Sequence, residues 1–231
     1  WGDEAWLRRR DHGLERPVSI YEVHLGSWRR VPEERDRVLG YRESARLLAE
    51  HVERLGFTHV QLMPITEHPA HDPWGQTPTG LFAPTSRYGP PRDLMALVDH
   101  LHQRDIGVIL DWAPWGLSSV GHGLARFDGS PLFERPDRDV FDLRRPEVRS
   151  FLTSSACHWL ERFHFDGLRI DVSESMLSTA HDCGEVLAFL RHLNETLYRR
   201  NPGIATIAQA GTPWPMVSRP TYVGGLGFGY R

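Results

Sequence analysis

One helix followed by one strand is encoded in residues 41–64, YRESARLLAEHVERLGFTHVQLMP. Leu48, Val52 and Leu55 recur at helical spacing, and Gly56 follows at the position where a helix C-cap is expected. Residues 57–64 are rich in residues that favour strands and end at a proline, which predicts a strand that stops there. The stretch therefore predicts one α/β unit, with its helix over 41–55.

The same alternation extends to both sides of this unit. Strands are expected at 18–25, 57–64, 108–111, 167–171 and 204–208, and helical spacing recurs near 41–55, 94–101, 148–163 and 186–197. Alternating strands and helices predict a parallel sheet, and polar residues at the strand ends favour a barrel. A complete (β/α)8 TIM-type barrel needs about 250 residues, so the chain predicts a truncated barrel of about the first five units. A doubly wound sheet is the alternative, although the first turn lacks its GxGxxG motif.

The predicted organisation is a lead-in segment at 1–17 and a barrel domain at 18–231. Two long insertions, 67–91 and 114–145, follow the second and third strands. They are rich in proline, glycine and aromatic residues. Because barrel enzymes carry their substrate contacts in such loops, we expect binding residues there.

Composition excludes several classes of protein. The 231 residues are 40% hydrophobic and 25% charged, all 27 positive residues are arginine, and the net charge is −3. No basic stripe indicates a nucleic-acid partner, and no apolar run reaches the roughly 18 residues that cross a membrane. The first ten residues are charged rather than signal-like, so a cytoplasmic location is expected by default. Cys157 and Cys183 stand in no metal or disulfide pattern, so we expect neither a zinc site nor a disulfide framework, and no other cluster in the sequence indicates a metal.

The pair Arg169 and Asp171 is the first candidate for chemistry. Residues two apart on a strand point to the same face. A neighbouring guanidinium keeps a carboxylate ionised, as a nucleophile attacking an anomeric carbon must be. The spacing alone favours an ordinary ion pair at the end of a strand, and only the surrounding sequence changes that interpretation.

Longer motifs narrow the choice. The stretch 165–177, FDGLRIDVSESML, resembles the nucleophile strand of glycogen branching enzymes within the alpha-amylase family, glycoside hydrolase family thirteen. Further matches follow in the family's order from residue 18 to residue 231: SIYEVHLGSW (19–28), GFTHVQLMP (56–64), PTGLFAPTSRYG (78–89), GVILDW (107–112), HGLARFDG (122–129) and RPTYVGGLGFG (219–229).

The resemblance implies roles for several residues. Asp171 aligns with the nucleophile that forms a covalent glucosyl intermediate, and Arg169 and Asp111 align with the residues that hold and polarise it. Trp74 aligns near the donor sugar subsite, and Trp112 is a second candidate aromatic contact. The implied reaction moves an α-1,4-glucan segment to a 6-hydroxyl with retention. The implied partner is an α-glucan such as glycogen or amylose, and no organic cofactor is needed.

The chain also departs from the family pattern. Gln209 stands at the general-acid position, Gly116 stands where a substrate-binding histidine is expected, and Gln76 replaces a tyrosine. An amide cannot transfer a proton, and such transfer contributes roughly 10²–10⁴ in rate. Glu174 is a weaker candidate for a replacement acid. The segment 134–141 is about ten residues shorter than the family usually shows, and the family's distal aspartate is missing.

Two functions follow from these departures. The chain is either an impaired or inactive relative of a branching enzyme, or else a non-catalytic glucan-binding relative or a degraded gene fragment. A second chain that supplies the missing strands could close the barrel without replacing Gln209. The histidines His100, His102 and His122 are expected at the surface or in loops rather than at a metal.

Overall fold

A computed structural model describes residues 1–10, 16–69, 74–136, 138–172, 183–209, 211 and 216–231. Its centre is a sheet of five parallel strands, whose order in the sheet is their order in the chain. They are β1 (Ile20–Val23), β4 (His59–Leu62), β5 (Gly107–Asp111), β8 (Gly167–Asp171) and β9 (Ala205–Gln209). A doubly wound sheet reverses its strand order at a switch point, whereas a barrel adds each strand beside the last. The observed order therefore excludes the doubly wound alternative and confirms a partial (β/α) barrel.

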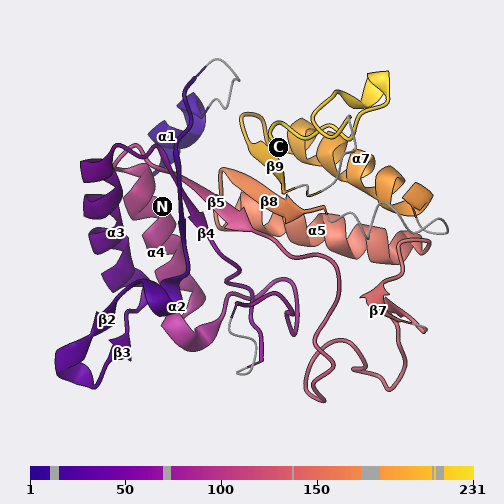
Figure 1. The fold of residues 1–231 in the computed structure, drawn as a ribbon, viewed down its shortest axis with the longest axis horizontal. Coiled ribbons are helices and arrows are strands. Elements are labelled where there is room, and N and C mark those ends of the chain that lie inside the picture. The colour runs from indigo at the N-terminus through magenta and orange to yellow at the C-terminus, as the bar shows by residue number, and fades with distance from the viewer. Residues whose placement is uncertain (11–15, 70–73, 137, 173–182, 210, 212–215) are drawn as a thin grey trace.

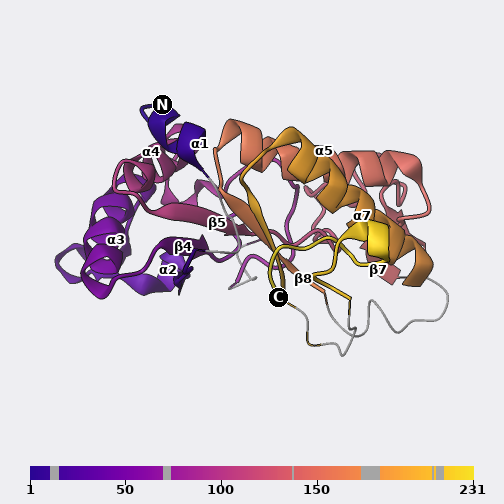
Figure 2. The ribbon, with the colours of Figure 1, turned by 90° about the horizontal axis from the view of Figure 1, so that it is seen from above.

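Four long helices flank this sheet: α3 (Tyr41–Leu55), α4 (Pro91–His102), α5 (Pro146–Arg162) and α7 (Cys183–Arg200). Helix α3 packs on α4 and α5 packs on α7. Figures 1 and 2 show the two pairs at opposite ends of the sheet. Helix α3 ends at the predicted residue, because Gly56 has a φ of 76° and donates its N–H to the carbonyls of Glu53 and Val52. Leu55 is 53% exposed, contrary to the prediction, because it is the last residue before the chain turns away.

Alternation along the strands separates two faces of the sheet. Leu110, Leu168 and Ile170 are fully buried, in the core that the helices cover. Asp111, which follows Leu110, and Arg169, which lies between Leu168 and Ile170, point to the opposite face, because successive side chains alternate. The face turned away from the helices therefore carries the polar residues.

A buried polar network joins the first helix to the opposite end of the sheet. Both ring nitrogens of His102 face carboxylates: Nδ1 lies 2.9 Å from Asp3 Oδ2, and Nε2 lies 2.8 Å from Asp166 Oδ2. Trp6, on α1 (Glu4–Arg9), donates its indole N–H to Asp166 Oδ1 at 2.8 Å, and His164 Nδ1 lies 2.8 Å from Asp3 Oδ2. The prediction of a surface His102 is wrong, because its side chain is fully buried. Whether residues 1–17 form a separate segment stays a prediction.

Several short elements have no counterpart among the predicted ones. They are helix α2 (Leu25–Trp28), the hairpin of β2 (Arg30–Val31) and β3 (Arg37–Val38), the hairpin of β6 (Glu134–Arg135) and β7 (Arg138–Phe141), and the 3-10 turns η1 (Pro32–Glu34), η2 (Ser86–Tyr88) and η3 (Thr221–Val223). They are too short for periodicity to reveal them. Among the described helices, none is long and apolar enough to cross a membrane. Cys157 and Cys183 are both free, the first buried and the second partly buried.

Candidate functional site

Four of the predicted site residues meet at the carboxyl ends of three neighbouring strands. In the register of the sheet, Asp111 on β5 stands opposite Arg169 on β8, and Asp171 on β8 stands opposite Gln209 on β9. Residues paired across parallel strands share a face, and neighbouring strands lie about 4.8 Å apart. The fold therefore gathers a carboxylate pair, a guanidinium and an amide into one row at the polar face.

The guanidinium of Arg169 hydrogen-bonds to Asp111. Its Nη1 lies 2.8 Å from Oδ1 and 2.7 Å from Oδ2 of that carboxylate. Burial raises the pKa of Asp111, and the nearby charges of Glu22 and Asp171 also raise it, while the bond from Arg169 opposes them. Among the described residues, the hydrogen bonds of Arg169 therefore go to Asp111 and not to Asp171, which lies two residues further along β8.

Two neighbours of Asp111 on the polar face of the sheet, the face turned away from the helices, were not predicted from the sequence. Gln61, on β4, donates to Glu22 Oε2 on β1 at 2.8 Å, and both lie on the face that carries Asp111. The alternation of side chains along each strand could have predicted their orientation, since each lies two positions from another residue of the same face. In the register of the sheet they lie level with Ile109, two residues before Asp111, so polar side chains of the same face also occur on β1 and β4.

Trp112 does not belong to this row. Its side chain is fully buried, and its indole N–H donates to Ser155 Oγ on α5 at 3.3 Å. Because it directly follows Asp111 on the strand, alternation turns it toward the helices. The prediction that Trp112 contacts a glucan is therefore wrong.

Trp74 lies at the same rim as the strand ends. It is 49% exposed, and its ring centre lies 5.2 Å from that of His24, which follows β1. Gln76, two residues further, is exposed. Gly75 between them has a φ of 70°, and a Cβ there would lie 2.7 Å from the Pro64 carbonyl oxygen. The turn at Gly75 thus brings the Trp74 loop close to the end of β4.

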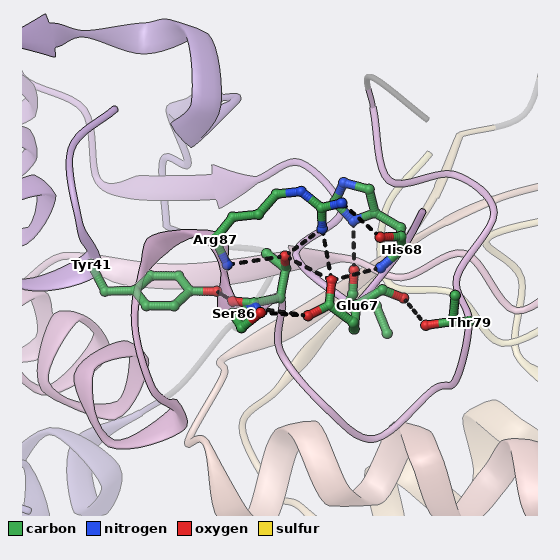
Figure 3. A network of polar contacts seen from close by, with 8 residues as sticks. Tyr41, Glu67, His68, Thr79, Ser86 and Arg87 are labelled. Atoms are coloured by element: carbon green, nitrogen blue, oxygen red, sulfur yellow. Dashed lines mark hydrogen bonds and ion pairs between the residues drawn. The ribbon is translucent and has the colours of Figure 1, made fainter. Parts of the chain in front are cut away.

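The carboxylate of Glu67 organises the loop that carries Trp74 (Figure 3). It accepts from Arg87 Nη1 at 2.7 Å, from Ser86 N at 2.9 Å and from Thr85 Oγ1 at 3.0 Å. Arg87 also donates to the carbonyl of His68 at 2.8 Å. Burial opposes ionisation of Glu67, but hydrogen bonds from the main-chain N–H groups of Ser86 and His68 and from the hydroxyls of Thr85 and Ser86 outweigh it and lower the pKa of Glu67. Charge-assisted bonds of this kind fix the loop where it leaves β4.

The loop after β5 places an unpredicted residue beside Asp171. Trp115 donates its indole N–H to the main-chain carbonyl of Asp171 at 2.7 Å, and Gly116, the predicted position of a lost histidine, follows it. The side chain of Trp115 is partly buried. Its position in the aromatic-rich loop was the only sequence signal.

Two candidate features remain to be placed. Glu174, the proposed replacement acid, lies outside the described residues. Within those residues no group of three or more His, Cys, Asp and Glu side chains could hold a metal ion. His122 is exposed in the loop after β5.

Comparison with known proteins agrees with the motifs. No family model matches the chain. Among curated proteins, it is 50% identical to the 1,4-alpha-glucan branching enzymes GlgB of Aquifex aeolicus and Aromatoleum aromaticum, over its whole length. The chain spans about two-fifths of these relatives, 41% and 40% respectively. The first alignment covers 256 residues, more than the 231 of this chain, so the relative carries residues that have no counterpart here.

Solved structures agree on the fold. A putative alpha amylase from Salmonella typhimurium superposes with a TM-score of 0.68 over 91% of this chain and 33% of its own, at 22% identity. A family GH13_31 enzyme gives 0.71 over 87% of this chain and 48% of its own, at 17% identity. At these identities the likeness supports the fold alone. Both matches fit a partial barrel of the alpha-amylase type.

Proposed function

We propose that this chain carries the nucleophile half of a retaining α-glucan site, because it is homologous along its whole length to part of the 1,4-alpha-glucan branching enzymes. Asp171 is the nucleophile, and Arg169 and Asp111 support it. The row of strand-end side chains carries the proposal, because it places Asp171 opposite Gln209 on neighbouring strands. Retaining enzymes hold their two carboxyl groups about 5–5.5 Å apart, which is close to the spacing of adjacent strands.

The proposed chemistry lacks the proton transfer that a general acid provides. In a retaining transfer the nucleophile attacks the anomeric carbon while an acid protonates the departing oxygen, and the same group later deprotonates the acceptor. Gln209 occupies the acid position with an amide, which has no proton to give at neutral pH. The chain therefore has little or no branching activity on glycogen or amylose. Trp74 offers a half-exposed aromatic face on which a glucose ring can stack.

An activated donor separates the two halves of this proposal. With α-maltosyl fluoride, the Asp171 carboxylate forms a bond to C1 as the C1–F bond breaks, and fluoride leaves with the electron pair without needing an acid. The glycosyl ester then persists, because Gln209 cannot activate water. We expect intact-protein mass spectrometry to show one maltosyl adduct, absent in Asp171→Asn, and azide to release it as a maltosyl azide.

Amylose, which has no activated leaving group, tests the second half of the proposal, the missing acid. We expect no new α-1,6 linkages with the natural sequence, and gain of activity in Gln209→Glu would show that the amide is the main defect. If the natural sequence forms branches and Asp171→Asn does not, the proposal that this chain has little or no branching activity is refuted. A folded protein that forms no adduct would overturn the nucleophile assignment.

The second candidate is a non-catalytic glucan-binding relative, which the amide at Gln209 and the glycine at Gly116 favour. Retention on a glycogen-containing gel without any fluoride-dependent adduct would support it. A partner chain that adds strands remains part of this proposal, since β1 and β9 are the two edges of the described sheet. On the β9 edge, Tyr230 already bridges Ile207, so an added strand would have to displace that contact. Sedimentation of the purified chain as a monomer at all concentrations would argue against self-association by these edges.

A further inference from the structure

The proline at position 114 interrupts the hydrogen-bond ladder beside Asp171. Strands β5 and β8 pair in parallel, and the ladder continues past β5 with the N–H of Trp112 donating to the carbonyl of Arg169 at 2.9 Å. In such a ladder the donors of one strand come from every second residue. The next donor toward β8 would be residue 114 and the next acceptor the carbonyl of Asp171. Proline has no N–H, so the main chain cannot make that bond.

The indole of Trp115 takes the place of the missing donor. Its Nε1–H donates to the Asp171 carbonyl at 2.7 Å, a short bond for a neutral donor. The main chain of Trp115 is itself held, because its carbonyl accepts from the N–H of Phe141 at 3.2 Å. The substitute bond thus ties the end of β8 to the long loop after β5.

The other side of β8 is fixed by the sheet itself. The N–H of Val172 donates to the carbonyl of Gln209 on β9 at 2.9 Å. The Asp171 carbonyl and the Val172 N–H belong to one peptide unit, so the indole bond holds this unit from one side and the β9 bond holds it from the other. The direction of a side chain follows from the main chain that carries it.

We propose that Trp115 is a positioning residue for Asp171, a role that rests on the function proposed above. Its indole replaces a ladder bond that Pro114 cannot make and so fixes the backbone from which the nucleophile extends. It contacts neither the sugar nor the reacting atoms in this role. Trp115→Phe keeps most of the ring and removes the donor, which makes it the informative variant.

Trp112 provides a matched control three residues away. It also donates an indole N–H, to Ser155 Oγ, but on the helix side of the sheet. In the maltosyl fluoride assay we expect Trp115→Phe to lower the maximal labelling rate about five- to tenfold, the effect of losing one hydrogen bond, with an unchanged half-saturating concentration. Trp112→Phe should lower the melting temperature and leave the labelling rate within twofold. Equal rates in the natural protein and Trp115→Phe would overturn the proposal.

A second readout keeps the test independent of labelling. In protein with ¹³C-labelled aspartate carbonyls, the Asp171 resonance is assigned by its absence in Asp171→Asn. Trp115→Phe should move it upfield, as expected for a carbonyl that loses its donor, and Trp112→Phe should leave it in place. If the natural protein forms no adduct but the shift occurs, the function fails and the backbone restraint stands. If the resonance does not move, the restraint itself is refuted.

Discussion

Replacing His102 by alanine is expected to destabilise the protein strongly. The imidazole is fully buried, and both its nitrogens face carboxylate oxygens of Asp3 and Asp166, at 2.9 and 2.8 Å. A neutral imidazole has one donor only, so this geometry requires the doubly protonated, cationic ring. Removing it leaves two buried carboxylates without their shared cation, which costs about 3–5 kcal/mol. At about 2–4 °C per kcal/mol for a chain of this size, the melting temperature should fall by roughly 6–20 °C.

The pH dependence supplies the sharper test. Burial alone would lower the pKa of His102, but the hydrogen bonds and charges of Asp166 and Asp3 outweigh it and raise the pKa above its usual value. A raised folded-state pKa means that this stabilisation is complete below the unfolded-state value of about 6.5 and is lost as the pH rises through the folded-state value. Burial also opposes ionisation of Asp3 and Asp166, yet their hydrogen bonds lower both pKa values, so their contribution is lost at acid pH. His164 and Arg10, which face Asp3 and Asp166, are left unchanged in the experiment.

Thermal unfolding of the natural protein and of His102→Ala should be followed by circular dichroism at about pH 6, below the unfolded-state pKa of histidine, and at about pH 9.5, well above it. The gap in melting temperature should be large at the lower pH and should narrow at the higher pH. His100→Ala is the control, because His100 lies on the same helix and no carboxylate is hydrogen-bonded to its ring in the described structure. A gap that is equal at both pH values, or equally large in the control, would refute the reasoning.

Three further predictions follow from single contacts. Trp74→Ala should weaken retention on glycogen gels about two- to tenfold with little change in melting temperature. Trp112→Ala should instead lower the free energy of unfolding in urea by about 3–5 kcal/mol and leave retention by the folded fraction unchanged. The opposite pattern would contradict the placement of both side chains. Gly167→Ala should prevent folding or destabilise it severely, because a Cβ there would lie 2.4 Å from the Ala205 carbonyl oxygen, and a soluble variant with a native circular dichroism spectrum would argue against this. Glu67→Gln should lower the free energy of unfolding by about 1–3 kcal/mol and speed proteolysis of the 67–91 loop. An unchanged cleavage rate in this loop would contradict the role of Glu67 in holding it.

The fold could be predicted because its signals repeat. Helix α3 and strand β8 have the predicted bounds, since buried residues recur at the helical or strand period and Gly56 marks the end of α3. The row of Asp111, Arg169, Asp171 and Gln209 followed from motifs at strand ends, because parallel strands end at one edge. Their chemical roles remain predictions.

The rest of the site depends on contacts between distant residues, which periodicity does not report. Trp112 was placed wrongly because its aromatic character was weighed above its position one residue after Asp111, although alternation along the strand turns it to the core. Trp115 was missed because its partner is a main-chain carbonyl 56 residues away. His102 was placed at the surface because its two carboxylates lie 99 and 64 residues from it along the chain.

Those same separations bear on the order in which the chain folds. Each α/β unit forms its sheet contacts with the unit beside it, while α1 needs His102, Asp166 and His164 to be in place before it can dock. Loop closure over such distances comes late, after local units have formed. Helix α1 therefore docks late, and the indole of Trp6 stays uncovered until His102 and Asp166 are in place. Synthesis thus has an interval in which the nascent chain exposes apolar surface, and a chaperone that holds the N-terminal segment would act during that interval.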